Sequence, residues 1–119
     1  MDKKTKKLLK EYNISESDLS NHEASIVIDV TSCRSDVFKI LNEFDFSIEE
    51  GNEDSIDGKE FINITGNLFS IFSLLSNLES HYGSIYTIGL TAAITGAVVY
   101  LSIPEARKKL MDNIKSLLK

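Results

Sequence analysis

The sequence has a single cysteine, Cys33, and nothing that resembles a secretory leader. One cysteine excludes an intramolecular disulfide, which fits a protein of a reducing compartment. The first lysines are followed only by Leu8 and Leu9 before polar residues return, so the apolar core of a signal peptide is missing. We therefore expect a cytoplasmic protein.

Motifs of catalytic and cofactor-binding sites are also missing. The sequence contains no G-x-G-x-x-G and no Walker A pattern. Cysteine and histidine are too few for a zinc site, and the acidic residues between Glu49 and Glu60 do not match an EF-hand loop. We expect no cofactor, no metal and no enzymatic activity. A small enzyme that uses Cys33 and His81 remains a second alternative.

The chain lacks the basic excess that is typical of nucleic-acid-binding proteins. It has 13 basic and 18 acidic residues and a net charge of −5, so no nucleic acid partner is expected. The charges are segregated, with lysines at the start, acids from Glu43 to Glu60 and bases again at the end. The stretch from Phe61 to Pro104 carries one charged side chain, Glu79.

The acidic segment is the clearest candidate for a binding surface. Eight acids lie between Glu43 and Glu60 against one base, Lys59. Such a segment attracts basic protein surfaces and speeds their encounter. The competing interpretation is a loop that its charges keep solvated. The candidate partner-binding residues are Glu49, Glu50, Glu53, Asp54, Asp57 and Glu60.

Periodicity of apolar residues predicts most of the secondary structure. Alternation predicts strands over residues 24–31, 46–49 and 59–65. Spacing of i, i+3, i+4 predicts helices over 33–43, with Ser32 or Ser35 as the N-cap, and over 68–82. The capping box of Ser102 and Glu105 marks the start of a last helix, on which Arg107 is expected to be exposed.

Residues 84–101 fit two periods. As strands they form a hairpin that turns near Thr95-Gly96, and their Ile, Val, Thr and Tyr content favours this interpretation. As a helix they place small residues on one face. The helical alternative also allows a membrane span, because residues 85–103 are 19 uncharged residues with bases following.

The resulting order of elements is β-α-β-β-α-β, which is typical of ferredoxin-like, split-βαβ domains. We predict an α+β protein with a small antiparallel or mixed sheet and two crossing helices. An extra strand, a C-terminal helix and a short N-terminal helix complete it. Residues 1–23 are expected to form a basic N-terminal helix and a polar linker or short capped turn, and residues 24–119 a single domain.

These features favour a small non-enzymatic interaction or regulatory module that acts through protein–protein contacts. We expect a protein partner of unknown identity, with self-association into a homo-oligomer as one form of that contact. The uncharged stretch would then be covered by another copy. The first alternative is a membrane-associated protein with a spanning helix at 85–103.

Overall fold

The computed structural model describes residues 1–51, 58–92 and 95–118, which form helices and one sheet. The helices are α1 (Lys3–Tyr12), α2 (Glu16–Ser20), α3 (Arg34–Leu41), α4 (Leu68–Tyr82) and α5 (Ile103–Leu117). The strands are β1 (Glu23–Asp29), β2 (Ser47–Gly51), β3 (Phe61–Asn67), β4 (Thr87–Thr91) and β5 (Val98–Ser102). The predicted α+β class is confirmed.

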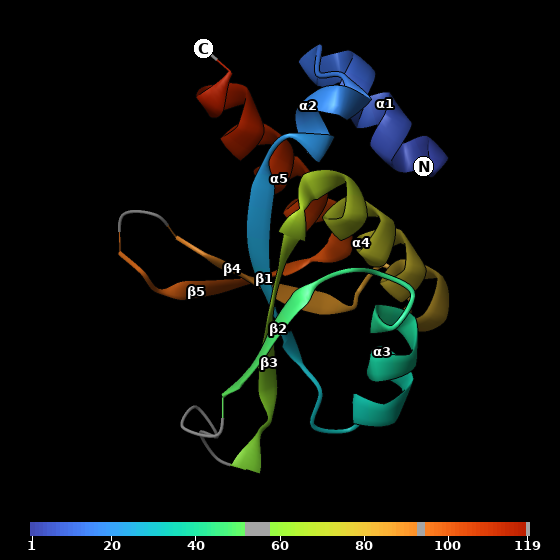
Figure 1. The fold of residues 1–119 in the computed structure, drawn as a ribbon, viewed down its shortest axis with the longest axis vertical. Helices are drawn as coiled ribbons and strands as arrows, with labels where there is room; N and C mark the ends of the chain where they lie inside the picture. The colour runs from blue at the N-terminus through green and yellow to red at the C-terminus, as the bar shows by residue number, and fades with distance from the viewer. Residues whose placement is uncertain (52–57, 93–94, 119) are drawn as a thin grey trace.

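The five strands form one antiparallel sheet in the order β2-β3-β1-β4-β5 (Figure 1). Along the chain, β1 to β4 alternate with α3 and α4 as β-α-β-β-α-β, while β5 and α5 are the additional strand and helix. The assignment to the ferredoxin-like class stays a prediction. Strands β2 and β5 are the two edges of the sheet, so they alone have a side without a neighbouring strand.

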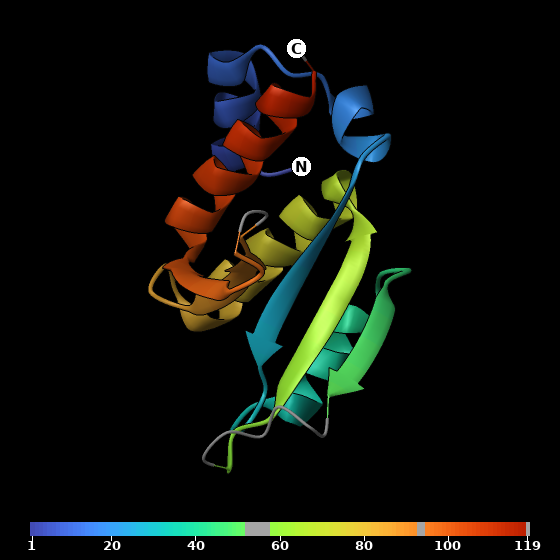
Figure 2. The same cartoon turned by 90° about the vertical axis from the view of Figure 1, so that its left-hand side faces the viewer.

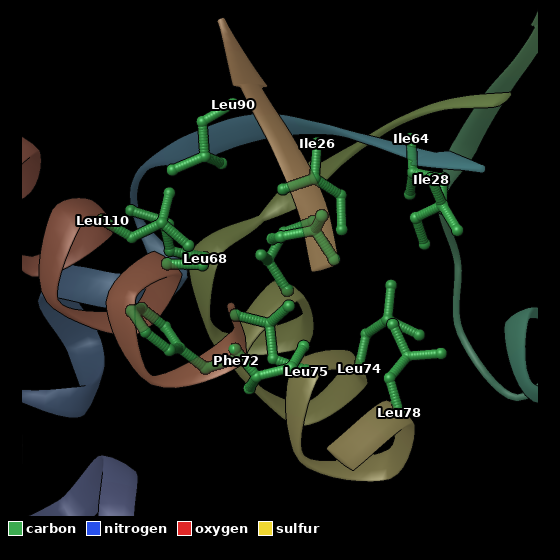
Figure 3. Close-up of a cluster of buried hydrophobic side chains, with 14 of the residues drawn as sticks. Ile26, Ile28, Ile64, Leu68, Phe72, Leu74, Leu75, Leu78, Leu90 and Leu110 are labelled. Carbon is green, nitrogen blue, oxygen red and sulfur yellow. The ribbon is translucent and has the colours of Figure 1, made fainter. Parts of the chain in front are cut away.

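The core lies between one face of the sheet and the helices. Ile26 and Ile28 of β1 are fully buried, and the residues between and beside them are partly exposed. They meet Phe72, Leu75 and Leu78 of α4 in one apolar cluster (Figure 3). Figure 2 shows α4 and α5 on this same side of β1 and β3. Neither of these two helices covers the opposite face of the sheet, which we call the open face.

Residues 84–101 contain a hairpin, so the spanning helix at 85–103 is wrong. Strand β4 pairs with β5, with Gly89 opposite Tyr100. The turn between them is closed by the amide of Ala92 donating to the carbonyl of Ala97 at 2.8 Å. Gly96 takes a positive φ of 69°, which glycine adopts without strain. Among the described helices none is long and apolar enough to cross a membrane.

The two basic ends of the chain lie side by side. Helix α1 packs along α5, where the Tyr12 hydroxyl donates to Asp112 Oδ1 at 2.8 Å and Lys115 Nζ donates to the Tyr12 carbonyl at 2.7 Å. Figures 1 and 2 show the first and last helices together. The predicted polar linker contains the short helix α2, whose capping box joins Ser15 and Asp18.

The predicted helix starts have different outcomes. Helix α5 begins at the capping box of Ser102 and Glu105, as predicted. For α3 the prediction of Ser32 or Ser35 as N-cap is wrong, because Cys33 occupies that position and makes no side-chain cap bond. A turn after β1, in which the Cys33 amide donates to the Val30 carbonyl at 3.3 Å, sets the helix start at this residue.

Candidate functional site

The predicted acidic surface is partly paired with a base of α3. Glu50 of β2 and Glu60 both form ion pairs with Arg34, the second at 3.3 Å. The Arg34 guanidinium also lies over the Phe38 ring, 4.9 Å from its centroid. Glu49 is exposed on β2. The remaining predicted residues lie outside the described part of the chain: Glu53, Asp54 and Asp57. The structure thus brings Glu50 and Glu60 together, through Arg34.

The two edge strands differ in the side chains that they present. Strand β2 carries Glu49 and Glu50, whereas β5 carries no charge at all. Val98, Val99 and Tyr100 of β5 are 41%, 47% and 47% exposed. Charged side chains on an edge strand discourage pairing with a strand of another molecule, and an apolar edge lacks that protection. Strand β5 is therefore the more exposed apolar edge.

The apolar residues of β5 point to both faces of the sheet. Val99 is opposite the buried Leu90 and so lies on the helix side, because cross-strand partners share a face. Tyr100 is opposite Gly89 and lies on the open face, where its ring centroid is 6.1 Å from that of Phe61. A strand added at β5 would meet apolar side chains on both faces.

Gly89 makes room for these side chains. A Cβ atom built at Gly89 would lie 2.5 Å from Val98 Cγ1, 3.1 Å from Tyr100 Cε1 and 3.2 Å from Val27 Cβ. Real Cβ atoms do not approach other atoms as closely as the first of these distances. The absence of a side chain at Gly89 thus lets Val98 and Tyr100 pack over β4, next to Val27 of β1.

Cys33 and His81, the residues of the enzymatic alternative, belong to a tyrosine cluster. Cys33 Sγ is 4.0 Å from the Tyr86 hydroxyl, and the Tyr86 ring stacks on Tyr82 at 4.8 Å between centroids. The exposed His81 ring is tilted against Tyr82 at 6.3 Å. Within the described residues no hydrogen bond joins Cys33 to His81. The nucleophile–base contact that defines a Cys–His pair is therefore not formed.

Burial shapes the chemistry of the two phenols. It raises the pKa of Tyr86 far above its ordinary value, and the neighbouring Cys33 adds to the effect. Burial and then Cys33 also raise the pKa of Tyr82. Burial thus favours the protonated, uncharged form of both phenols.

A cleft of about 450 Å³ lies between α3 and the end of α4. It is lined by Asp36, Lys39, Ile40, Glu43, His81 and Tyr82. Its size suits a small ligand, and its lining combines the acids Asp36 and Glu43 with the base Lys39. No group of three metal-binding side chains forms in the described ranges.

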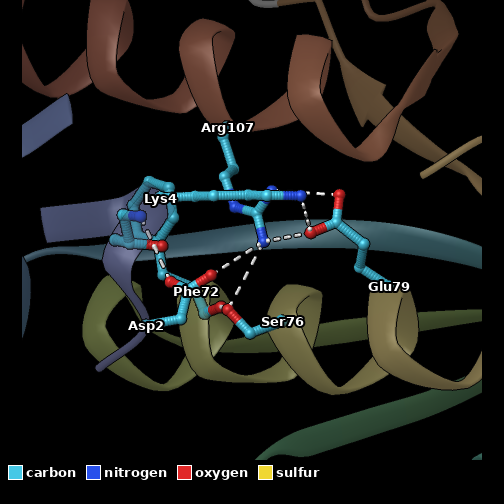
Figure 4. A network of polar contacts seen from close by, with 7 residues as sticks. Asp2, Lys4, Phe72, Ser76, Glu79 and Arg107 are labelled. Atoms are coloured by element: carbon cyan, nitrogen blue, oxygen red, sulfur yellow. Dashed lines mark hydrogen bonds and ion pairs between the residues drawn. The ribbon is translucent and has the colours of Figure 1, made fainter. Parts of the chain in front are cut away.

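Arg107 is buried, which corrects the expectation that it would be exposed. Its side chain is 2% exposed and donates to both carboxylate oxygens of Glu79, at 3.1 and 3.3 Å (Figure 4). It also donates to Asp2 Oδ2 at 3.2 Å and to Ser76 Oγ at 3.4 Å. Lys4 Nζ contacts Glu79 at 3.0 Å. The only charge between Phe61 and Pro104 therefore balances a buried arginine.

The pKa of Glu79 reflects this arrangement. Burial of the carboxyl group raises the pKa, but hydrogen bonds from Arg107 and Lys4, together with their positive charges, hold it below the ordinary 4.5. Burial likewise raises the pKa of Asp2, while hydrogen bonds from Thr5 and Ser76 and the charge of Arg107 lower it overall. The network thus favours both carboxylates in their ionised form.

The comparisons with known proteins give no counterpart. No protein-family model, no curated protein and no solved structure matches the chain.

Proposed function

We propose that this protein is a non-enzymatic interaction module that binds protein through its β5 edge, with a second copy of the chain as the first partner. The observation that carries the proposal is the contrast between the edges. Strand β5 presents Val98, Val99 and Tyr100 without a charge, while β2 presents two glutamates. An exposed apolar edge is a template for strand addition.

A second copy suits this edge because antiparallel pairing of β5 with itself sets each strand against its own equivalent. A charged residue in the strand would then lie near the same charge of the other copy, close to the two-fold axis of the dimer. Strand β5 contains no charged residue, so it avoids this repulsion. Pairing would also extend the sheet continuously from one copy into the other. The shared edge is five residues long, which favours weak, reversible association.

The test is sedimentation velocity on the whole chain up to about 1 mM, where a Kd of that size still corresponds to about 4 kcal/mol. Wild type should sediment faster as its concentration rises. Val99→Lys should stay monomeric, because it places a like charge at the paired edge. Ile85→Lys is the matched control, since Ile85 is 84% exposed and lies outside β4 and β5.

Two results would overturn the proposal. One is a wild-type protein that stays monomeric at about 1 mM and recovers no partner from a pull-down. The other is equal loss of association in Val99→Lys and Ile85→Lys. Loss on reversal of Glu49 and Glu50 to Lys, with Val99→Lys unaffected, would instead place the contact at the acidic segment.

A further inference from the structure

A groove of about 240 Å³ runs between α1 and the start of α5, and none of its lining residues belongs to β5. Helix α1 contributes side chains from one of its faces, and α5 contributes side chains from its first turns. The lining residues are Lys4, Lys7, Leu8, Glu11, Pro104, Arg107 and Lys108. Four of these seven are cationic and one is an acid.

Two of the four cations are already balanced. Arg107 is held by Glu79 and Asp2, and Lys4 also contacts Glu79. Lys7 and Lys108 are exposed, and neither forms an ion pair with any residue that the structure describes. They line the groove from different helices, Lys7 from α1 and Lys108 from α5.

The groove lies at the positive end of a strongly polar molecule. Residues 1–12 and 103–119, which include α1 and α5, contain ten basic and four acidic residues. The rest of the chain contains three basic and fourteen acidic residues. An anion is therefore attracted to this end and repelled from the other, at distances up to a Debye length of about 8 Å at physiological salt.

We infer that this groove binds a phosphate-bearing anion. A phosphate carries up to about two negative charges and several acceptor oxygens that point in different directions, so it can contact Lys7 and Lys108 at once. The volume equals that of about eight water molecules, which is room for a phosphate or a short polyphosphate. Arg107 lines the groove, and its Nε atom is buried without a hydrogen-bond partner among the described residues.

The experiment titrates the whole chain with tripolyphosphate at low salt and follows backbone amide shifts by NMR. Lys7→Gln/Lys108→Gln should weaken binding at least tenfold. The control is Lys39→Gln/Lys59→Gln, which removes the same charge from two exposed lysines outside the groove and should stay within twofold of wild type. All four lysines are exposed, so both variants should fold, and their amide spectra verify this.

A second arm distinguishes the source of the phosphate. Vesicles that contain phosphatidic acid are compared with neutral vesicles in a sedimentation assay, with the same variants. Binding of tripolyphosphate alone supports a soluble ligand, and binding of the anionic vesicles supports a lipid headgroup. Absence of binding in both arms, or equal weakening by the groove and control variants, overturns the inference. Shifts confined to residues outside α1 and α5 would overturn it as well.

Discussion

Removal of one charge from Glu79 should destabilise the fold far more than removal of the same charge from an exposed glutamate. The perturbation is Glu79→Gln, which keeps the shape of the side chain. It leaves Arg107 buried, at 2% exposure, with Asp2 as its only remaining carboxylate at 3.2 Å. Arg107 would then lose its principal counterion while its side chain stays almost entirely shielded from water.

The magnitude follows from the geometry. Loss of one partner from a buried ion pair costs about 3–5 kcal/mol. Two features reduce the cost here: Asp2 still balances part of the charge, and the glutamine oxygen can accept one of the two bonds that Arg107 donates to Glu79. We expect a loss of about 2–3 kcal/mol in the free energy of unfolding. That is a large share of the ~5–15 kcal/mol of a typical domain.

Urea denaturation followed by far-UV circular dichroism measures the loss. Glu43→Gln is the matched control, because Glu43 is exposed and its side chain forms no ion pair with the residues that the structure describes. A double variant, Glu79→Gln/Arg107→Met, should recover part of the stability by removing the unbalanced charge as well. A loss in Glu79→Gln no larger than that in Glu43→Gln would refute the reasoning.

The ion pair of Glu79 and Arg107 also predicts that the stability of the protein depends on pH. The folded state holds the pKa of Glu79 below the ordinary 4.5, so the contribution of this group to stability is present above 4.5 and is lost as pH falls through the lower, folded value. Glu79→Gln has no such group. The difference in unfolding free energy between wild type and Glu79→Gln should therefore be constant at neutral pH and shrink below about pH 4.5. A difference that stayed constant in acid would contradict the assignment of the stabilisation to the ionised carboxylate.

Two smaller predictions concern the hairpin and the helix that follows it. Gly89→Ala should cost about 1–3 kcal/mol, because the new Cβ would lie 2.5 Å from Val98 Cγ1 and must displace it; thermal unfolding measures this, and an unchanged Tm would contradict the close approach. Ser102→Ala should cost about 1 kcal/mol, because its hydroxyl accepts from the Glu105 amide at the start of α5. Ser84→Ala, at an exposed position before β4, is the control for Ser102→Ala and should have no effect.

Much of the fold could be predicted from local pattern. The alternation of Ile26, Ile28 and Val30 and the apolar stripe of residues 68–82 give β1 and α4 at nearly their observed bounds. The capping box of Ser102 and Glu105 gives the start of α5. These signals lie within a few residues of the structure that they specify, so no tertiary information is needed to interpret them.

The error at Arg107 arises because its burial depends on residues distant in sequence. The sequence predicts an exposed Arg107 because its charge sets it apart from the apolar face of Leu110 and Ile114. Its partners Asp2 and Glu79, however, come from the N-terminus and α4. No pattern around residue 107 contains that information. One indirect signal was present: a single acid within 44 otherwise uncharged residues, Phe61 to Pro104, needs a specific partner if it is buried.

The fold changes how the segregated charges are distributed in space. The basic start and basic end of the chain are more than 90 residues apart in sequence, yet α1 and α5 pack together and concentrate the bases at one end. The uncharged stretch between Glu79 and Glu105 contains β4 and β5, the two strands of the hairpin. The basic groove and the apolar edge are thus separate surfaces. The groove suits an anion, and the edge suits an uncharged strand. Added salt should weaken the binding of an anion in the groove, because salt screens the attraction between charges. It should leave strand pairing at β5 nearly unchanged, because β5 carries no charge and pairs through apolar side chains and backbone hydrogen bonds.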